Sequence, residues 1–251
     1  MSVELSVVIP LYNEEQNVAP LLAELSAILT SMPVPHEVVL IDDGSTDGTF
    51  EVLRRIQKNY QHVRVVRFAR NVGQTAAFAA GFAYARGQFI VTFDGDLQND
   101  PADIPRLLEI ARTHDVVCGW RKDRKDDFLT RYVPSVIANH LIGLVSGVHV
   151  HDVGCSLKVF RAEVVKPLKL TPGMHRYLPA LASQLGGRVA EVEVHHRPRQ
   201  HGRSKYNLSR TFTVIGDLVQ LRRLMREAVD PAAPLPHLYD VAEIRTSGLH
   251  S

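Results

Sequence analysis

The sequence predicts an α/β fold in which helices cover a mainly parallel β-sheet. Short β-branched runs alternate with amphipathic stretches through the first half of the 251 residues, as they do in strand–helix–strand units. These runs are apolar without alternation, which is expected of strands that are buried on both faces. A polar, turn-forming cluster follows each of the first four runs. Because ligands of such sheets bind at the carboxyl ends of the strands, these clusters are the candidate binding loops.

Five strands and four helices are expected in the first half. The strands are the β-branched runs at 5–10, 37–42, 63–68, 88–94 and 115–119. The helices have apolar residues at helical spacing and are expected at 17–32, 47–60, 74–86 and 101–112. Asp47 or Thr46 is expected to cap the second helix, and Asp100 the fourth, which begins at Pro101. Gly73 is expected to ease the turn into the third helix.

The second half is less regular. Helices are expected near 129–146 and 174–185, and strands near 153–160 and 188–196. A single domain over 1–210 would then be followed by an amphipathic helix over 211–230 and a flexible tail over 231–251.

Composition excludes several classes of protein. Hydrophobic content of 45% and charged content of 22% are near the averages for globular proteins, so neither disorder nor a multi-span membrane protein is expected. A net charge of +2 is too small to indicate a partner, and no nucleic-acid partner is expected. Cys118 and Cys155 lack CxxC spacing, which favours reduced thiols in the cytoplasm. No secretory signal is expected, and the uncharged stretch 132–151 is a poor membrane span because it contains Pro134 and Asn139.

The fourth strand ends in DGD, residues 94–96. Asp94 and Asp96 can both face one cation, while Gly95 lets a ligand approach the backbone. Gln98 adds a neutral oxygen ligand. Mg²⁺ is usually held by one or two carboxylates together with phosphate oxygens, so these residues predict a metal site. The alternative is ordinary turn chemistry, which accounts for Asp100 but not for the mutual repulsion of so many carboxylates.

Two further loops carry groups that suit a nucleotide. Asp42 and Asp43 end the second strand, where a carboxylate accepts hydrogen bonds from ribose hydroxyls or a base N–H. PLYNEE, residues 10–15, follows the first strand, although its acids also suit the first turn of a helix. Neither a P-loop nor a GxGxxG motif occurs, so the phosphates of a nucleotide would have to be neutralised by a metal and by arginine.

A basic segment lies late in the chain. It contains no acid, and its cations are Arg197, Arg199, Arg203, Lys205 and Arg210, with three histidines nearby. We expect this segment to attract an anion.

Together these loops resemble the inverting nucleotide-sugar glycosyltransferases of family 2, which have the Rossmann-like GT-A fold. The segments that carry the resemblance are VVIPLYNEE, IDDGSTDGT, RNVGQTAAFAAG and DGDLQNDP. Their order and spacing are similar to those of the polyprenyl-phosphate branch, typified by dolichol-phosphate mannose synthases and bacterial undecaprenyl-phosphate sugar transferases. RPRQHGRSKY is the branch-specific part, and the resemblance extends over residues 3–210.

The resemblance implies a role for each matching residue. The residues implied to contact the base and ribose are Pro10, Tyr12, Glu14, Ile41 and Asp43. The residues implied to bind the metal and the donor diphosphate are Asp94, Gly95 and Asp96, with Gln98 as a further metal ligand. The residues implied to bind phosphate are Arg121, Arg199, Arg203 and Lys205. Asp152 corresponds to an aspartate with a base-like or positioning role, so it and Arg121 are the catalytic candidates; a simple turn residue is the other interpretation of Asp152.

The implied activity is Mg²⁺- or Mn²⁺-dependent transfer of a hexose, with inversion, from a UDP- or GDP-sugar to a polyprenyl phosphate. Metal and arginine would stabilise the charge that grows on the leaving diphosphate. Because the acceptor phosphate is already an anion near neutral pH, no strong base is needed. Two alternatives stay open: a soluble relative that glycosylates a hydroxyl acceptor, and a non-catalytic nucleotide-binding protein.

One departure from the family concerns the membrane. Many bacterial members have two transmembrane helices after the basic loop, whereas residues 207–228 are interrupted by Asp217 and too charged to span a bilayer. This segment suits either a helix lying at a membrane surface or a helix packed on the domain. A cytoplasmic location is expected, with peripheral attachment to the cytoplasmic membrane face under the first interpretation.

Overall fold

The computed structural model describes residues 2–122, 143, 147–148, 150–198, 226–230 and 237–246. The helix predicted near 129–146 lies almost entirely outside the described residues, and so do Arg199, Arg203, Lys205 and most of the segment 211–230. Residues 226–229 of that segment are helical. None of the helices formed by the described residues is both long enough and apolar enough to cross a membrane.

An eight-stranded sheet in the order β7-β5-β6-β4-β1-β2-β3-β8 forms the centre of the molecule. Its strands are β1 (Leu5–Leu11), β2 (His36–Asp42), β3 (Val63–Phe68), β4 (Phe89–Thr92), β5 (Val116–Trp120), β6 (Lys158–Arg161), β7 (Val189–Glu193) and β8 (Val241–Thr246). β1 pairs in parallel with β2 and β4, β2 with β3, and β5 with β7. Only β6 and β8 run antiparallel to their neighbours among the described strands. The predicted mainly parallel sheet is confirmed.

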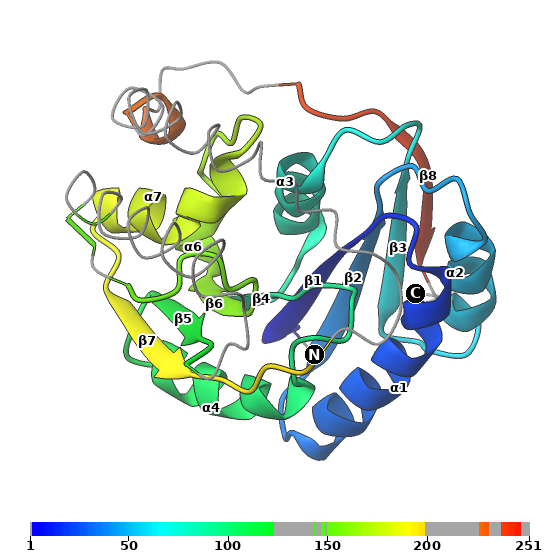
Figure 1. The fold of residues 1–251 in the computed structure, drawn as a ribbon, viewed down its shortest axis with the longest axis horizontal. Coiled ribbons are helices and arrows are strands. Elements are labelled where there is room, and N and C mark those ends of the chain that lie inside the picture. Colours follow the sequence, from blue (N-terminus) through cyan, green and yellow to red (C-terminus); the bar gives the residue numbers. More distant parts are fainter. Residues whose placement is uncertain are drawn as a thin grey trace.

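Helices cover both faces of this sheet (Figure 1). One face packs against α1 (Glu15–Ser31), α2 (Thr49–Gln57) and α4 (Ile104–Ala111), which follows the 3₁₀ turn η1 (Pro101–Asp103). The other packs against α3 (Gln74–Tyr84), α6 (Ala162–Val165) and α7 (Leu178–Gln184), which follows the 3₁₀ turn η3 (Met174–Tyr177). Val7 and Ile9 face the first group, and Val8 faces the second. Because alternate side chains are buried on opposite faces, the strands are apolar throughout.

The topology brings the polar loops to one edge. β1, β2, β3, β4, β5 and β7 all run in the same direction, because β6 is antiparallel to both β4 and β5. Their carboxyl ends therefore lie along a single edge of the sheet, where the loops after β1 to β4 meet the end of β5.

β8 corrects the expected flexible tail over 231–251. Residues 241–246 pair with β3, and Tyr239 stacks on Phe68 with the ring centroids 4.8 Å apart. The sequence does not indicate this strand, because two of its three more buried positions hold Glu243 and Arg245, which form an ion pair. Ile244 is 48% exposed. The alternation that marks a half-buried strand is thus reversed.

Candidate functional site

The loops after β1 and β2 are joined into one rigid border of the site. The backbone N–H of Asn13 donates to Ser45 Oγ at 3.0 Å, and Thr46 N–H donates to Asn13 Oδ1 at 2.9 Å. Glu14 N–H donates to Thr49 Oγ1 at 2.8 Å. Asn13 has a left-handed φ of 54°, which asparagine tolerates better than most residues. These bonds leave Tyr12 and Glu14 partly exposed at the border.

Pro10 and Ile41, two of the predicted nucleotide contacts, are partners in adjacent strands near this edge. Pro10 is partly exposed. The Ile41 side chain is completely buried in the core, on the face that α3 covers. Ile41 can therefore offer a ligand only its backbone.

Asp43 holds the loop that follows β3. Its Oδ1 accepts a hydrogen bond from Val72 N–H at 2.8 Å. Its Oδ2 accepts from Gly73 N–H and from Asn71 Nδ2, each at 2.9 Å. Gly73 has φ 99°, a conformation that favours glycine, so the predicted turn role of this residue is confirmed. Both oxygens of Asp43 are engaged within the protein, and its contact with a ribose or base stays a prediction.

The acidic loop after β4 is tightly shaped. A Cβ on Gly95 would lie 2.4 Å from Leu11 Cδ2, so no other residue fits there without a shift. Leu97 has a φ of 63°, which is unusual for a bulky residue and marks a strained backbone. Asp94 accepts a hydrogen bond from Gln74 Nε2 at 3.0 Å, and Asp96 accepts one from the Gln98 N–H at 3.2 Å.

The two carboxylates of this loop influence each other. Burial raises the pKa of Asp94 from 3.8 to about 6, and the charge of Asp96 adds to the rise, while a hydrogen bond with Ser156 and the charges of Arg121 and Lys158 oppose it. Asp96 is 9% exposed. An acid whose pKa is raised by burial and by a neighbouring carboxylate favours the uptake of a cation or a proton.

Asp94 is therefore expected to lower the stability of the metal-free protein at neutral pH. Its pKa is higher in the folded than in the unfolded state, so its contribution is most favourable below pH 4 and declines as pH rises through about 6. We expect Asp94→Asn to raise the free energy of unfolding at pH 7 by about 1–2 kcal/mol, and by almost nothing near pH 4. Urea unfolding in chelator at both pH values measures this, with the exposed Glu109→Gln as control. A stability loss at pH 7 would contradict the assignment.

Asp100 caps the helix that follows the acidic loop, as predicted. Its side chain accepts a hydrogen bond from Ala102 N–H at 3.0 Å. It also pairs with Arg197, whose second nitrogen contacts Glu24 at 2.6 Å. Burial acts to raise the pKa of Asp100, but these bonds outweigh it and lower the pKa. Asp47 accepts from Thr49 N–H at 3.0 Å, but the cap residue of α2 is Gly48, so the expected cap by Asp47 or Thr46 is wrong by one residue.

In the described part of the basic segment, residues 195–198, basic side chains are already paired with acidic ones. Arg197 is held by Glu24 and Asp100, and His195 Nδ1 lies 3.0 Å from Asp103. These acids come from distant parts of the sequence, so a local count of charges overstates how strongly residues 195–198 attract an anion. Arg197 and Gln98 also bond through their backbones at 2.8 Å, which fixes the acidic loop against the end of β7.

Arg121 and Asp152 form a bidentate ion pair at the end of β5. Arg121 Nε lies 2.7 Å from Asp152 Oδ2, and one terminal nitrogen lies 2.9 Å from Oδ1. The side chains are 13% and 4% exposed. Glu191 fixes Asp152 in turn, because its Oε1 accepts from the backbone N–H of Asp152 at 3.1 Å and of His151 at 2.8 Å. Since both oxygens of Asp152 bind the guanidinium, the geometry favours the positioning interpretation over the base.

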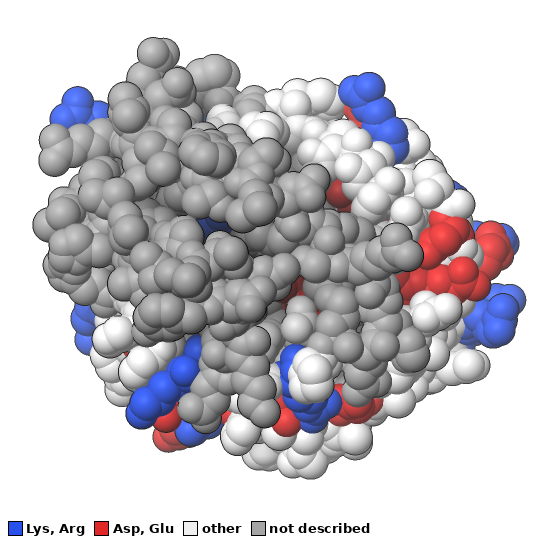
Figure 2. Space-filling view, viewed as in Figure 1, with Lys and Arg blue, Asp and Glu red and all other residues white. Residues whose placement is uncertain are grey.

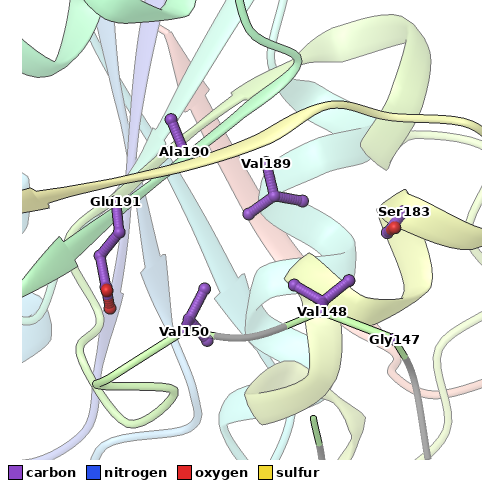
Figure 3. A pocket seen from close by; sticks show the side chains of 7 residues that line it. All are labelled: Gly147, Val148, Val150, Ser183, Val189, Ala190 and Glu191. Carbon is purple, nitrogen blue, oxygen red and sulfur yellow. The ribbon is translucent and has the colours of Figure 1, made fainter. Parts of the chain in front are cut away.

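A pocket of about 250 Å³ is lined in part by Glu191, the residue that accepts from the backbone of Asp152 (Figure 3). Its lining is Gly147, Val148, Val150, Ser183, Val189, Ala190 and Glu191. None of the predicted site residues that the structure describes lines it. These described residues instead lie near the carboxyl edge of the sheet.

Four contributors to the site were not predicted. Gln74 donates to Asp94, Ser156 acts to lower the pKa of Asp94, Glu191 holds Asp152, and Lys158 donates to the loop 152–157. Only Lys158 carries a signal in the sequence, as a charged residue that opens an apolar strand. The others become visible only when the fold joins segments far apart in the chain.

The residues present fit a divalent cation that is bound together with a ligand. Among the described residues, no group of three or more His, Cys, Asp and Glu side chains is placed to hold a metal ion. Asp94 and Asp96 would thus supply two carboxylates, and the remaining positions would go to phosphate oxygens and water, which suits Mg²⁺ or Mn²⁺. The Nε2 of Gln98 lies 3.4 Å from the carbonyl oxygen of Arg197, so Gln98 also links the acidic loop to the start of the basic segment.

Solved structures share this architecture. Mannosyl-3-phosphoglycerate synthase from Rubrobacter xylanophilus matches 98% of this chain and 89% of its own, with a TM-score of 0.70 and 16% identity. Glucosyl-3-phosphoglycerate synthase from Mycobacterium tuberculosis, in complex with Mn²⁺, UDP-glucose and glycerol 3-phosphate, matches 88% of this chain and 80% of its own, with a TM-score of 0.67 and 20% identity. At these identities the likeness shows the fold alone, and it confirms the predicted GT-A architecture.

Relatives identified by sequence are more similar to this chain than these solved structures are. Dodecaprenyl-phosphate galacturonate synthase from Rhizobium johnstonii is 47% identical over 92% of this chain and 70% of its own length. Undecaprenyl-phosphate 4-deoxy-4-formamido-L-arabinose transferase from Edwardsiella ictaluri is 40% identical over 85% of this chain and 66% of its own. This chain therefore spans about two thirds of the length of these relatives. The family model described as "Glycosyl transferase family 2" matches residues 6–168, and the chain belongs to that glycosyltransferase family.

Proposed function

We propose that this chain transfers a sugar, with inversion, from a nucleoside-diphosphate sugar to a polyprenyl phosphate. The observation that carries the proposal is the meeting of two unlike groups at one edge of the sheet. Asp94 and Asp96 are suited to a divalent cation, and Arg121 is close enough for its charge to act on Asp94. A cation and a guanidinium side by side are what a leaving diphosphate requires.

The donor would lie along the edge, with its nucleotide against the border formed by the first two loops. Tyr12 and Glu14 are exposed enough to contact a base or ribose. The donor diphosphate would reach Asp94 and Asp96 through Mg²⁺ or Mn²⁺, which when bound supplies positive charge to the leaving group. Mn²⁺ and UDP-glucose in a structure of the same fold are consistent with this arrangement.

The choice of acceptor rests on the absence of an available base at Asp152. Transfer to a sugar hydroxyl requires a group that removes a proton. Both carboxylate oxygens of Asp152 bind Arg121, so they are poorly placed for that task. A phosphate acceptor needs no such base, because it is already an anion near neutral pH. The names of both sequence relatives also refer to polyprenyl phosphates.

Arg199, Arg203 and Lys205 are proposed to bind the acceptor phosphate, although they lie outside the described residues. Figure 2 shows that the described rim of this face mixes Lys and Arg with Asp and Glu, with acidic side chains gathered where α2 lies. An approach by an anionic lipid from that acidic side would be unfavourable. Attachment to the cytoplasmic face of a membrane is part of the proposal, and co-sedimentation with anionic liposomes at low salt is the expected result.

The experiment that tests the activity is a donor panel. The protein is mixed with Mn²⁺ or Mg²⁺, undecaprenyl phosphate and one radiolabelled UDP- or GDP-linked hexose or uronic acid at a time. We expect chelator-sensitive transfer of label into the organic phase for at least one donor. A parallel series with oligosaccharide acceptors tests the alternative of a hydroxyl acceptor. Transfer only to the oligosaccharides would replace the proposal by that alternative, and no transfer across the whole panel would contradict both.

A further inference from the structure

Lys158 is a buried cation with no assigned role in the proposed reaction. It opens β6 and is 4% exposed. Thr92 of β4 and Cys118 of β5 are its partners across the sheet, so it stands between two strands near the carboxyl edge. Its ammonium group forms no ion pair with any of the residues that the structure describes. Removing an ammonium group from water is costly unless hydrogen bonds compensate for the lost solvation.

The ammonium group binds backbone instead. Lys158 Nζ donates to the carbonyl oxygen of Val153 at 3.2 Å and to that of Cys155. The loop 152–157 therefore wraps around this side chain, and two of its three N–H donors are satisfied by that loop.

The same loop holds both halves of the candidate site. At its start, Asp152 binds the guanidinium of Arg121. Near its end, the Ser156 side chain accepts a hydrogen bond from Asn99 Nδ2 of the acidic loop at 2.8 Å, and Ser156 acts to lower the pKa of Asp94. Any change in the shape of this loop would move the guanidinium and the acidic pair relative to each other.

We propose that Lys158 is a positioning residue that shapes loop 152–157 so that Arg121 and Asp94 meet the same diphosphate. This inference rests on the proposed function for the identity of that ligand. The ammonium suits the task because it is long enough to reach both carbonyl oxygens and because a hydrogen bond from a charged donor is stronger than one from a neutral donor. Lys158 acts through the loop and does not itself contact substrate.

The first test follows amide hydrogen exchange in the metal-free protein, with Lys158→Met compared to Lys166→Met. Lys166 is a matched control, since its Nζ also donates to a backbone carbonyl, that of Ala85 at 2.6 Å, away from the loop. We expect Lys158→Met to speed exchange within 152–157 by about tenfold or more while leaving 162–169 unchanged, because opening of a loop without its anchor is local. Lys166→Met is expected to leave 152–157 unchanged. Equal exchange in wild type and Lys158→Met would overturn the inference.

The second test measures binding of inorganic pyrophosphate with Mn²⁺ by calorimetry in a double-mutant cycle. Lys158→Met is expected to weaken binding by about tenfold, and to cost clearly less than that in an Arg121→Ala background, because part of its effect is on the placement of Arg121. Additive losses, or an equal loss in Lys166→Met, would count against the inference. If Lys158→Met does not fold, Lys158→Gln replaces it in both tests, with the same outcomes expected. The hydrogen-exchange test needs no substrate. If the wild-type protein shows no transferase activity, that result contradicts the proposed function but not the role of Lys158 in shaping the loop.

Discussion

Asp96→Ala is expected to lower kcat/KM for sugar transfer by about 10³-fold or more, which corresponds to about 4 kcal/mol of transition-state stabilisation. Asp96 is one of the two carboxylates of the acidic loop, and its charge acts on Asp94; its loss leaves a divalent cation with a single carboxylate. The cation supplies the charge that opposes the leaving diphosphate, so the effect falls on the chemical step. Folding should be retained, because removal of one of two close acids relieves their repulsion.

Asp100→Ala is the matched control in the same loop. Asp100 caps η1 and pairs with Arg197, so its loss should reduce the free energy of unfolding by about 1 kcal/mol. Activity should stay within a few-fold of wild type. Activity assays and urea unfolding on both variants are therefore expected to give opposite patterns. Asp96→Ala loses activity and keeps its fold, whereas Asp100→Ala loses stability and keeps most of its activity. Retained turnover in Asp96→Ala would refute the metal assignment.

Much of the fold could be predicted because the strands are buried on both faces. Continuous β-branched runs are a local property, so β1 to β5 are visible without knowledge of their partners. The parallel order of the strands also predicts that the loops after them lie at a single edge of the sheet. β8 could not be predicted in this way, since two of its three more buried positions are charged and the strand with which it pairs, β3, lies far away in the chain.

The chemical identity of the site could be predicted more fully than its internal contacts. Asp94 and Asp96 are recognisable because two carboxylates on either side of a glycine repel each other unless something compensates. By contrast, the engagement of Asp43 with the loop at 71–73 and of Arg197 with Glu24 depends on contacts 28 to 173 residues apart in sequence. A local pattern shows which groups are present, and the fold decides which of them remain available to a ligand.

Arg121→Met is expected to damage both stability and activity. The variant leaves Asp152, whose side chain is 4% exposed, as a buried carboxylate without its partner. Loss of one member of a buried ion pair costs about 3–5 kcal/mol. The same variant removes the guanidinium from the diphosphate site, so we expect kcat/KM to fall by about 10²–10³-fold. Urea unfolding at pH 7 and the transfer assay measure the two effects separately.

Adding Asp152→Asn to Arg121→Met separates the two causes. The double variant has no buried unpaired charge, so most of the lost stability should return, because neutral replacement of both members of a buried pair is often tolerated. Activity should stay at the level of Arg121→Met, since the guanidinium is still missing. Recovery of activity together with stability would show that the pair serves the fold alone. If activity stays low while stability returns, Arg121 acts on the diphosphate and Asp152 serves to position it.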